Sequence, residues 1–404
     1  MKKKPVKNKK KILIFTATRA EYGLFRPIIK KAEKFFDIRL LVGGTHISPE
    51  DGFTINEILE DGVDNIRTIP FLLASRTPGA LCVSVGNGLI QMSAVLEDYK
   101  PDFIMVLGDR YEIFIPVIAA VLHNIPVIHI HGGEITEGVI DEQIRHAVTK
   151  MSHVHFVSSP VYADNVSRMG EEDWRIFVIG APGLDNIRRI GKKSVADIKK
   201  RIGVDLSSPT MICTYHPVTI SGMMDIETQV HNLVKALSSF DGQVIFTRPN
   251  AEVGSEIIVR KLKEAVHQNQ DRFSFFDSLG TELYHNVVRH CVAVIGNSSS
   301  GIIEAPFHKV PTVNIGERQK GRLHPPSVIE SGLKTAEIRK SIQKALDDDF
   351  QKSLKDMVCP FGDGKAGDYA LASLKQVAGM NTIDLLQKKL DFDVNPEKRH
   401  KFWS

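Results

Sequence analysis

Residues 292–306 read VAVIGNSSSGIIEAP, and this stretch indicates the fold of the second half of the chain. An apolar run stops at Gly296, three serines follow, and a second apolar run begins after Gly301. A short apolar run that ends at glycine is typical of a buried strand, and serine before an apolar run is typical of a helix start. The stretch therefore predicts a strand–loop–helix unit, the repeating element of a doubly wound α/β sheet.

The same rhythm recurs along the chain. Continuous apolar runs of this kind are expected of parallel strands covered on both faces. Helix-like segments separate the runs of the first half, at 21–34, 84–98, 111–123, 141–152 and 160–169. The expected strands lie at 11–16, 38–43, 102–108, 125–130, 153–157 and 175–180, and then at 210–216, 243–247, 272–276, 292–296 and 311–316.

A cluster of glycine and proline at 180–186, GAPGLDN, interrupts this alternation and predicts a domain boundary. We expect a basic disordered tail over 1–10, a Rossmann-like domain over 11–182 and a second one over 183–365. Residues 366–404 have helical patterning without a strand signal, so we expect them to pack on one of the two domains. The predicted fold class is α/β, with two doubly wound domains that face each other across a ligand-binding cleft.

The composition is that of a soluble globular protein, with 42% hydrophobic and 25% charged residues in 404. Seven of its lysines lie in residues 2–11, so the net charge of +4 comes from this tail. We expect no nucleic-acid partner, and no membrane span because no apolar run approaches about 20 residues. Four widely spaced cysteines predict reduced thiols and a cytoplasmic protein.

The serine stretch itself predicts a phosphate site. Free N–H groups at a helix start and the hydroxyls of Ser298 and Ser299 can all donate to phosphate, and Gly301 would let a ligand approach the backbone. Plain capping is the alternative, and we expect Ser300 to be the cap. Glu304 has the wrong charge for phosphate but suits the paired hydroxyls of a ribose, so the combination predicts a nucleotide.

Charged residues also follow the strands of the first half. Arg19 lies on the turn after the first strand, where it is either a phosphate ligand or a surface arginine. Asp109 and Arg110 directly follow the strand 102–108 and are expected at the same edge of the sheet. A structural Asp–Arg pair or a helix cap is the alternative for these two residues.

The segment 129–150, HIHGGEITEGVIDEQIRHAVTK, offers several acid–base groups close to Asp109. We expect no metal site here, because no pair of histidines has the spacing of a zinc-binding helix. The candidate groups are His129, His131, Glu134, Asp141 and His146, and Arg145 lies within the same helix start.

In the second half, His216 and Asn250 follow expected strands, and Arg318 follows the last one. This polar and basic rim, opposite the carboxylates of the first half, fits a nucleotide sugar. The phosphates would lie on the basic side and the sugar between the carboxylates.

Seven motifs in order resemble the hydrolysing UDP-N-acetylglucosamine 2-epimerases of bacterial sialic- and legionaminic-acid pathways. The motifs are TATRAEYGL, VLGDRYEIF, HIHGGE, DEQIRHAVTKMSH, HPVT, IGNSSSGIIEAP and NIGERQKGR. The resemblance covers residues 11–366 and implies a GT-B type fold, with two Rossmann-like domains and a C-terminal helix crossing back to the first. It also implies a homodimer or homotetramer.

The resemblance further implies that UDP is eliminated to give a glycal, and that water then adds to give free N-acetylmannosamine, without NAD, metal or other cofactor. The implied catalytic residues are Asp109, Glu134, Asp141 and His216. The implied UDP and substrate contacts are Arg19, Gly23, Arg110, Arg145, His216, Asn250, Leu279, Ser298, Ser299, Glu304 and Arg318. The same reaction on UDP-N,N'-diacetylbacillosamine is an alternative, and a GT-B glycosyltransferase is an alternative of another class.

Overall fold

The computed structural model describes residues 9–75, 77–137, 140–218, 224–250 and 254–402. The chain divides into two compact units, which we call the first and the second domain. The first contains Met1–Asn186 and Pro360–Ser404, and the second contains Ile187–Cys359. The domain boundaries predicted from the sequence, after residues 182 and 365, lie a few residues from the boundaries in the structure, after residues 186 and 359. Most of the predicted basic tail, residues 1–8, lies outside the described residues.

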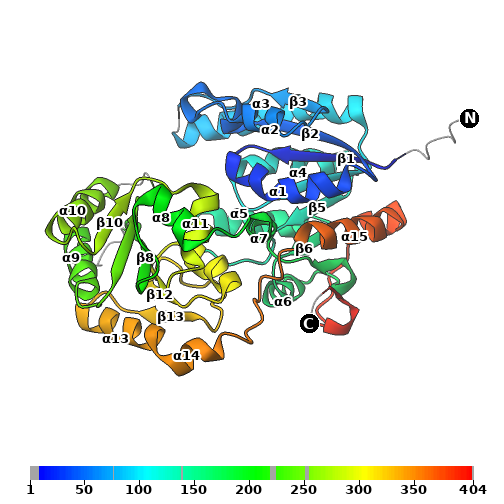
Figure 1. The fold of residues 1–404 in the computed structure, drawn as a ribbon. Coiled ribbons are helices and arrows are strands. Elements are labelled where there is room, and N and C mark those ends of the chain that lie inside the picture. The colour runs from blue at the N-terminus through cyan, green and yellow to red at the C-terminus, as the bar shows by residue number, and fades with distance from the viewer. Residues whose placement is uncertain (1–8, 76, 138–139, 219–223, 251–253, 403–404) are drawn as a thin grey trace, which may run out of the picture. The chain divides into compact units, whose positions relative to one another are not determined.

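The first domain contains a parallel sheet with the strand order β14-β7-β6-β5-β4-β1-β2-β3 (Figure 1). The expectation of no strand after residue 366 is wrong, because β14 pairs with β7. The short strand β3 was also missed. The strands are β1 (Lys11–Thr16), β2 (Asp37–Gly43), β3 (Ile66–Ile69), β4 (Phe103–Leu107), β5 (Val127–Ile130), β6 (Val154–Val157), β7 (Ile176–Val178) and β14 (His400–Lys401).

Helices cover both faces of this sheet, which explains the continuous apolar runs. Ile12 and Ile14 of β1 point into one apolar cluster, and Leu13 and Phe15 point into another on the opposite face. The α-helices of this domain are α1 (Arg19–Ala32), α2 (Ile55–Glu60), α3 (Pro78–Tyr99), α4 (Phe114–Leu122), α5 (Ile140–Met151), α6 (Pro160–Arg168), α15 (Ala366–Ala378) and α16 (Thr382–Leu386), and the boundary to the second domain lies within α7 (Gly183–Arg189).

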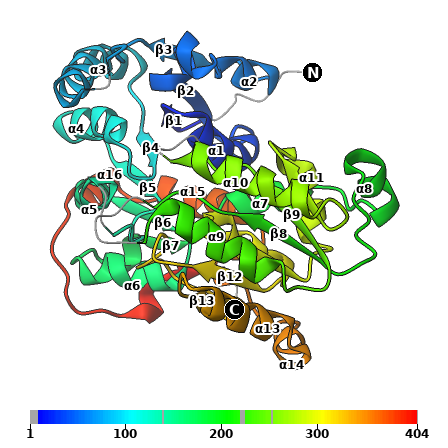
Figure 2. The same cartoon turned by 90° about the vertical axis from the view of Figure 1, so that its left-hand side faces the viewer.

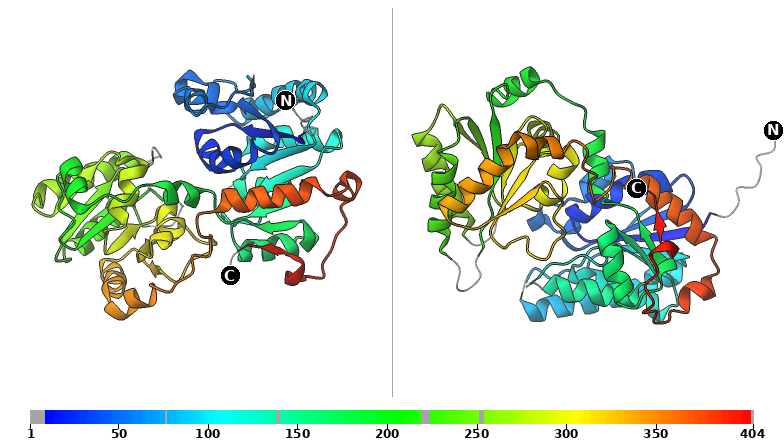
Figure 3. Two further views of the ribbon diagram at one scale, coloured as in Figure 1. Left: turned by 45° about the vertical axis from the view of Figure 1, so that its right-hand side comes forward. Right: turned by 90° about the horizontal axis from the view of Figure 1, so that it is seen from below.

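The C-terminal segment belongs to the first domain because helix α15 packs along α1 (Figure 3). Farther along the segment, the carbonyl oxygens of Asp384 (3.1 Å), Leu385 (2.8 Å) and Gln387 (3.1 Å) accept from a guanidinium of the domain. It is the buried guanidinium of Arg175, which precedes β7. A buried guanidinium is costly unless its donors are satisfied, so these bonds attach the segment to the domain specifically.

The second domain contains a parallel sheet with the order β10-β9-β8-β11-β12-β13, again with helices around it (Figure 2). Its strands are β8 (Thr210–Thr214), β9 (Gln243–Thr247), β10 (Phe273–Phe276), β11 (Ala293–Gly296), β12 (Thr312–Ile315) and β13 (Val328–Ser331), of which β13 was not predicted. Its helices are α8 (Val195–Ile202), α9 (Ile226–Leu237), α10 (Ser255–Gln268), α11 (Gly280–Val288), α12 (Ser299–Ile303), α13 (Thr335–Leu346) and α14 (Asp348–Ser353).

Both sheets have the strand order of a Rossmann-like fold, which confirms the prediction of two doubly wound α/β domains. The direction of chain progress reverses between β1 and β4 in the first sheet and between β8 and β11 in the second. Ligands of open α/β sheets bind beyond the carboxyl ends of the strands at such a reversal. We therefore expect the ligand-binding residues directly after these four strands.

One described helix, α3, is long and apolar enough to cross a membrane, with a mean hydropathy of 1.5 over its most apolar window. The sequence predicts a helix at 84–98, within this segment, but not its length or its capacity to span a membrane. Only 28% of that window is buried, and the core helices of soluble proteins pass the same test of length and composition. The feature is weak evidence for a membrane span.

Candidate functional site

In the second domain, the chain turns sharply after β11. Gly296 has a φ of +131°, and a Cβ there would lie 2.0 Å from the carbonyl oxygen of Thr214. Only glycine fits this turn. Asn297 follows, accepting from the backbone N–H of His216 (2.7 Å) and donating to its carbonyl (2.9 Å). Asn297 thus joins the loops after β8 and β11, a role that the local sequence pattern does not predict.

The three serines have different roles. Ser298 is the N-cap of α12, because its hydroxyl accepts from the N–H of Ser300 (3.4 Å). The prediction that Ser300 is the cap is therefore wrong. The Ser300 hydroxyl instead lies 2.6 Å from that of Tyr284 on α11. Since α12 has only five residues, local N–H groups and hydroxyls, rather than a long helix dipole, are the donors that this loop offers.

Gly301 has a packing role. A Cβ at this position would lie 2.8 Å from Cγ2 of Thr312 on β12. The glycine allows α12 to lie close to the sheet, which corrects the expectation that it makes room for a ligand.

A cavity of about 350 Å³ lies over the carboxyl ends of β8, β9 and β11. This volume is within the range of small-molecule sites, about 300–1,000 Å³. The cavity brings together five predicted residues, and its polar and cationic lining suits an anion. The lining residues are Thr214, His216, Thr247, Arg248, Asn250, Tyr284, Ser298, Ser299, Ser300, Arg318 and Arg322.

Two predicted residues of this domain do not line the cavity. Leu279 precedes α11 and packs against an apolar cluster. Glu304 ends α12, with its Oε2 at 3.7 Å from Nε2 of His285. Burial raises the pKa of Glu304 to about 7, although 34% of its side chain remains accessible.

In the first domain, Asp109 and Arg110 follow β4 as predicted. Arg110 forms a bidentate pair with the fully buried Glu112, at 2.7 Å and 3.2 Å. Burial alone would lower the pKa of Arg110, but the bond to Glu112 and its charge raise it above the ordinary value. This pair holds the guanidinium in place, and 42% of the Arg110 side chain is exposed.

Arg145 of α5 connects the loops that follow β4 and β5. Its side chain is 5% exposed and forms an ion pair with the Asp109 carboxylate. Its Nη1 also donates to the carbonyl of Glu134 (2.8 Å) and to the hydroxyl of Thr136 (2.9 Å). The structure therefore brings Asp109, Glu134 and Arg145 together.

The histidines of this segment differ in their surroundings. His129 is fully buried in β5, its Nε2 lies 2.8 Å from the Gly108 carbonyl, and burial lowers its pKa to about 3. It is a structural histidine and not the acid–base group considered above. His146 contacts Glu142 at 3.0 Å. His131 contacts the Glu134 carboxylate through Nδ1 at 2.5 Å.

The other predicted residues of the first domain lie on helices. Asp141 is in the first turn of α5. Arg19 begins α1, is 71% exposed, and pairs with Glu57 at 2.8 Å. Gly23 lies within α1, where a Cβ would have no neighbour within 4 Å, and its carbonyl accepts from Asn186 (2.9 Å). Ligand contacts by these three residues remain predictions.

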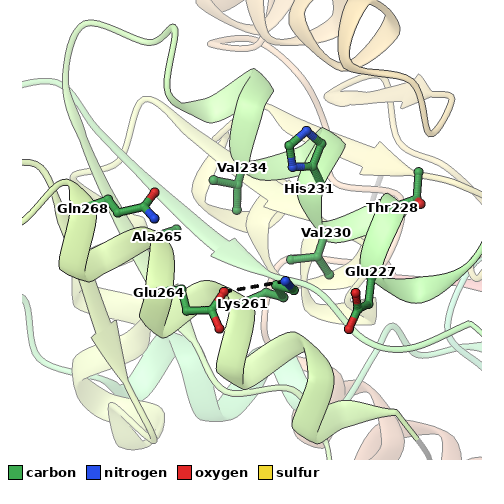
Figure 4. A pocket seen from close by; sticks show the side chains of 9 residues that line it. All are labelled: Glu227, Thr228, Val230, His231, Val234, Lys261, Glu264, Ala265 and Gln268. Atoms are coloured by element: carbon green, nitrogen blue, oxygen red, sulfur yellow. Dashed lines mark ion pairs between the residues drawn. The ribbon is translucent and has the colours of Figure 1, made fainter.

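Another cavity, of about 500 Å³, lies between α9 and α10, where the side chains of Glu227, His231 and Lys261 border it (Figure 4). None of the predicted site residues lines it. In the described part of the chain, no group of three or more His, Cys, Asp or Glu side chains is placed to hold a metal ion.

Comparison with known proteins gives concordant results. Residues 29–375 match the family model described as UDP-N-acetylglucosamine 2-epimerase. The chain is 37% identical to a GDP/UDP-N,N'-diacetylbacillosamine 2-epimerase (hydrolyzing) of Campylobacter jejuni, over 81% of this chain and 85% of the relative. It is 34% identical to the UDP-N,N'-diacetylbacillosamine 2-epimerase (hydrolyzing) of Legionella pneumophila, over 91% and 96%.

The Escherichia coli polysialic acid biosynthesis protein P7 is 36% identical, over 84% of this chain and 87% of the relative. Among solved structures, the UDP-GlcNAc 2-epimerase of Neisseria meningitidis bound to UDP-GlcNAc matches with a TM-score of 0.75 at 16% identity, over 91% of this chain and 100% of that one. At that identity the match supports the fold alone.

Proposed function

Since the chain belongs to the hydrolysing UDP-N-acetylglucosamine 2-epimerase family, we propose that it converts UDP-N-acetylglucosamine and water into UDP and free N-acetylmannosamine. The reaction would serve the synthesis of sialic-type acids. The proposal rests on two features of the chain, a cavity in the second domain whose lining suits an anion and a cluster of acid–base groups in the first domain. A binding protein without catalysis would not need the second feature.

The cavity of the second domain would hold UDP. Ser298, Ser299 and Arg318 line it and carry donors that suit a diphosphate. His216 and Asn250 line the same cavity, and the Asn250 N–H donates to Nδ1 of His216 at 3.1 Å. As UDP leaves, donors of this kind stabilise the charge that develops on it, which lowers the barrier to elimination.

We also propose contacts between the nucleotide sugar and residues outside this cavity. Glu304 would accept from the ribose hydroxyls, and Leu279 would contact the nucleotide nearby. From the first domain, Arg19, Gly23, Arg110 and Arg145 would contact UDP or the sugar.

The first domain would supply the acid–base chemistry through Asp109, Glu134 and Asp141. A proton must leave C2 of the sugar, and another must return to C2 on the opposite face, so at least two groups are needed. The C2 proton is very weakly acidic, and its base must be held within about 3 Å. Arg145 and His131 hold two of these carboxylates in fixed positions, as such a site requires.

Two alternatives to this function, another sugar substrate and a glycosyltransferase, can be tested in one experiment. Relatives named for diacetylbacillosamine favour the same reaction on UDP-N,N'-diacetylbacillosamine, which would give 2,4-diacetamido-2,4,6-trideoxymannose. A glycosyltransferase would need an acceptor before it releases UDP. The purified protein should be incubated with each nucleotide sugar, without acceptor, and UDP and free sugar measured. Release of both from UDP-N-acetylglucosamine supports the proposal, and release only from UDP-N,N'-diacetylbacillosamine supports the alternative substrate. Intact substrate in both reactions contradicts the proposed reaction.

We further propose that the protein is cytoplasmic and forms a homodimer or homotetramer. Helices α3 and α4 pack together and expose large apolar side chains, among them Val83 (52%), Ile90 (76%) and Leu122 (76%). Exposed apolar patches on soluble proteins commonly mark interfaces. Sedimentation analysis should find an oligomer, and Ile90→Asp together with Leu122→Asp should shift it towards monomer.

A further inference from the structure

We propose that His131 is the general base that takes the C2 proton through its Nε2 atom, and that Glu134 is a positioning residue behind it. The inference rests on the proposed function, because it assigns a step of that reaction. It changes the role of Glu134, which the sequence analysis placed among the groups that act on the sugar directly.

His131 lies at the edge of the sheet where the fold places the chemistry. It directly follows β5, and its N–H donates to the carbonyl of Phe156 at the end of β6 (3.0 Å). The neighbouring strand β4 ends beside it, since the Gly108 N–H donates to the carbonyl of Ile130 (2.9 Å). Asp109 comes next along the chain. Adjacent strands are about 4.8 Å apart, so His131 and Asp109 occupy neighbouring positions.

The contact with Glu134 fixes which nitrogen can act as a base. The carboxylate Oε1 of Glu134 lies 2.5 Å from Nδ1 of His131 and also accepts from the Ser158 hydroxyl at 2.7 Å. A carboxylate accepts hydrogen bonds, so the proton of the neutral ring lies on Nδ1. The lone pair is then on Nε2, which makes Nε2 the proton acceptor.

The Nε2 atom of His131 makes no contact that would occupy its lone pair in the described part of the chain. It is buried, and it has no hydrogen-bond partner among the described residues. An unsatisfied buried polar atom costs roughly 1–3 kcal/mol, so its presence needs an explanation. The use of Nε2 by a substrate proton provides one.

The backbone gives independent support. His131 has a φ of +66°, in the left-handed region that residues other than glycine seldom occupy. Such a conformation costs about 1–2 kcal/mol, and residues in it that do not end a helix cluster at functional sites. The next residues keep the turn in place, because a Cβ at Gly133 would lie 2.4 Å from the carbonyl of Tyr162. The turn therefore fixes the direction of the imidazole.

The step balances as follows. Nε2 of His131 takes the proton from C2, the C2–H electron pair forms the C1=C2 double bond, and the C1–O bond breaks with its pair leaving on UDP. The imidazolium that forms is stabilised by the negative charge of Glu134. Asp109 and Asp141 remain available for the addition of water at C1 and for protonation of C2 on the opposite face.

Imidazole rescue tests this assignment. His131→Gly suits the left-handed backbone and leaves a space for free imidazole. We expect kcat to fall by at least about 100-fold, the scale of a lost general base, with KM changed by less than about threefold. Added imidazole should restore kcat at least about tenfold, and a C2-deuterated substrate should react more slowly in the rescued reaction.

Three matched variants complete the experiment. His131→Gln should lose kcat as severely, and imidazole should not restore it because the amide fills the space. Glu134→Gln should lose activity, and added imidazole should not restore it, because the imidazole of His131 still fills its place in this variant. His123→Gln changes an exposed histidine at the end of α4 and should match the wild type with and without imidazole.

The outcomes separate the two proposals. A wild-type protein that releases no UDP refutes the proposed function. An active wild type whose His131→Gly variant folds but is not rescued overturns only the role of His131. If His131→Gly does not fold, His131→Gln decides, and more than about a tenth of wild-type kcat in that variant overturns the assignment.

Discussion

Arg145 offers the most quantitative test of the first domain, because one buried side chain contacts Asp109, Thr136, the Glu134 carbonyl and, at 3.6 Å, the Glu142 carboxylate. Arg145→Met would keep the apolar stem and remove the guanidinium. The ion pair with Asp109 and the hydrogen bonds to the Glu134 carbonyl and Thr136 would be lost. The Asp109 side chain is 23% exposed, so its charge would be left largely desolvated and unpaired.

The size of the effect follows from these contacts. Removal of one partner of a buried ion pair costs about 3–5 kcal/mol, because the other charge remains buried. We expect the free energy of unfolding of the first domain to fall by this amount. For a domain of this size, roughly 2–4 °C in Tm corresponds to each kcal/mol, so Tm should fall by about 6–20 °C.

Denaturant unfolding of wild type, Arg145→Met, Asp109→Asn and the double variant measures the coupling between the two residues. The coupling energy should be at least about 1.5 kcal/mol, since the residues are in direct contact. Asp109→Asn alone should keep UDP affinity and abolish turnover. A loss below about 1 kcal/mol for Arg145→Met, or additive effects in the cycle, would refute the reasoning.

Three further predictions concern other parts of the molecule. Ser299→Ala should weaken UDP binding about 5- to 30-fold in calorimetry, because it removes a donor from the cavity; unchanged affinity would exclude that contact. Gly296→Val should prevent correct folding of the second domain, visible as lost UDP binding and a lower Tm, because its Cβ would overlap a Thr214 backbone atom; a native-like melt would contradict this. Acidification from pH 7 to pH 5 should lower the unfolding free energy of the first domain by at least about 2 kcal/mol. Burial lowers the pKa of five of its histidines, so the stability that they contribute is lost as the pH falls below their unfolded value of about 6.5, whereas burial raises the pKa of Glu21 to about 7 and opposes the trend. Unchanged stability at pH 5 would count against the neutral state of these histidines, which are His46, His129, His153, His155 and His400.

The sequence predicted the central strands because they are buried on both faces and read as continuous apolar runs. It missed β3, β13 and β14, which are short and lie at the outer ends of the sheets. The two residues of β14 are stabilised by pairing with β7, a contact remote in sequence. Local patterning carries no signal for such an element.

The candidate site was predictable where residues directly follow strands, as Asp109, His216 and Ser298 do. The finer roles were not, because they depend on partners distant in sequence. The local sequence predicts a cap at Ser300, but its hydroxyl contacts that of Tyr284 on α11. It predicts a ligand approach at Gly301, but this glycine packs against Thr312. Similarly, only the contact with Glu134 identifies the tautomer of His131.

The most direct test of the account is the fate of the C2 hydrogen. The protein should be incubated with UDP-N-acetylglucosamine, and separately with UDP-N,N'-diacetylbacillosamine, in deuterated water without an acceptor, and the products followed by NMR. We predict UDP and a free 2-epimeric sugar with deuterium at C2 from one of them. A free sugar with retained configuration and protium at C2, or unchanged substrate in both reactions, would contradict it.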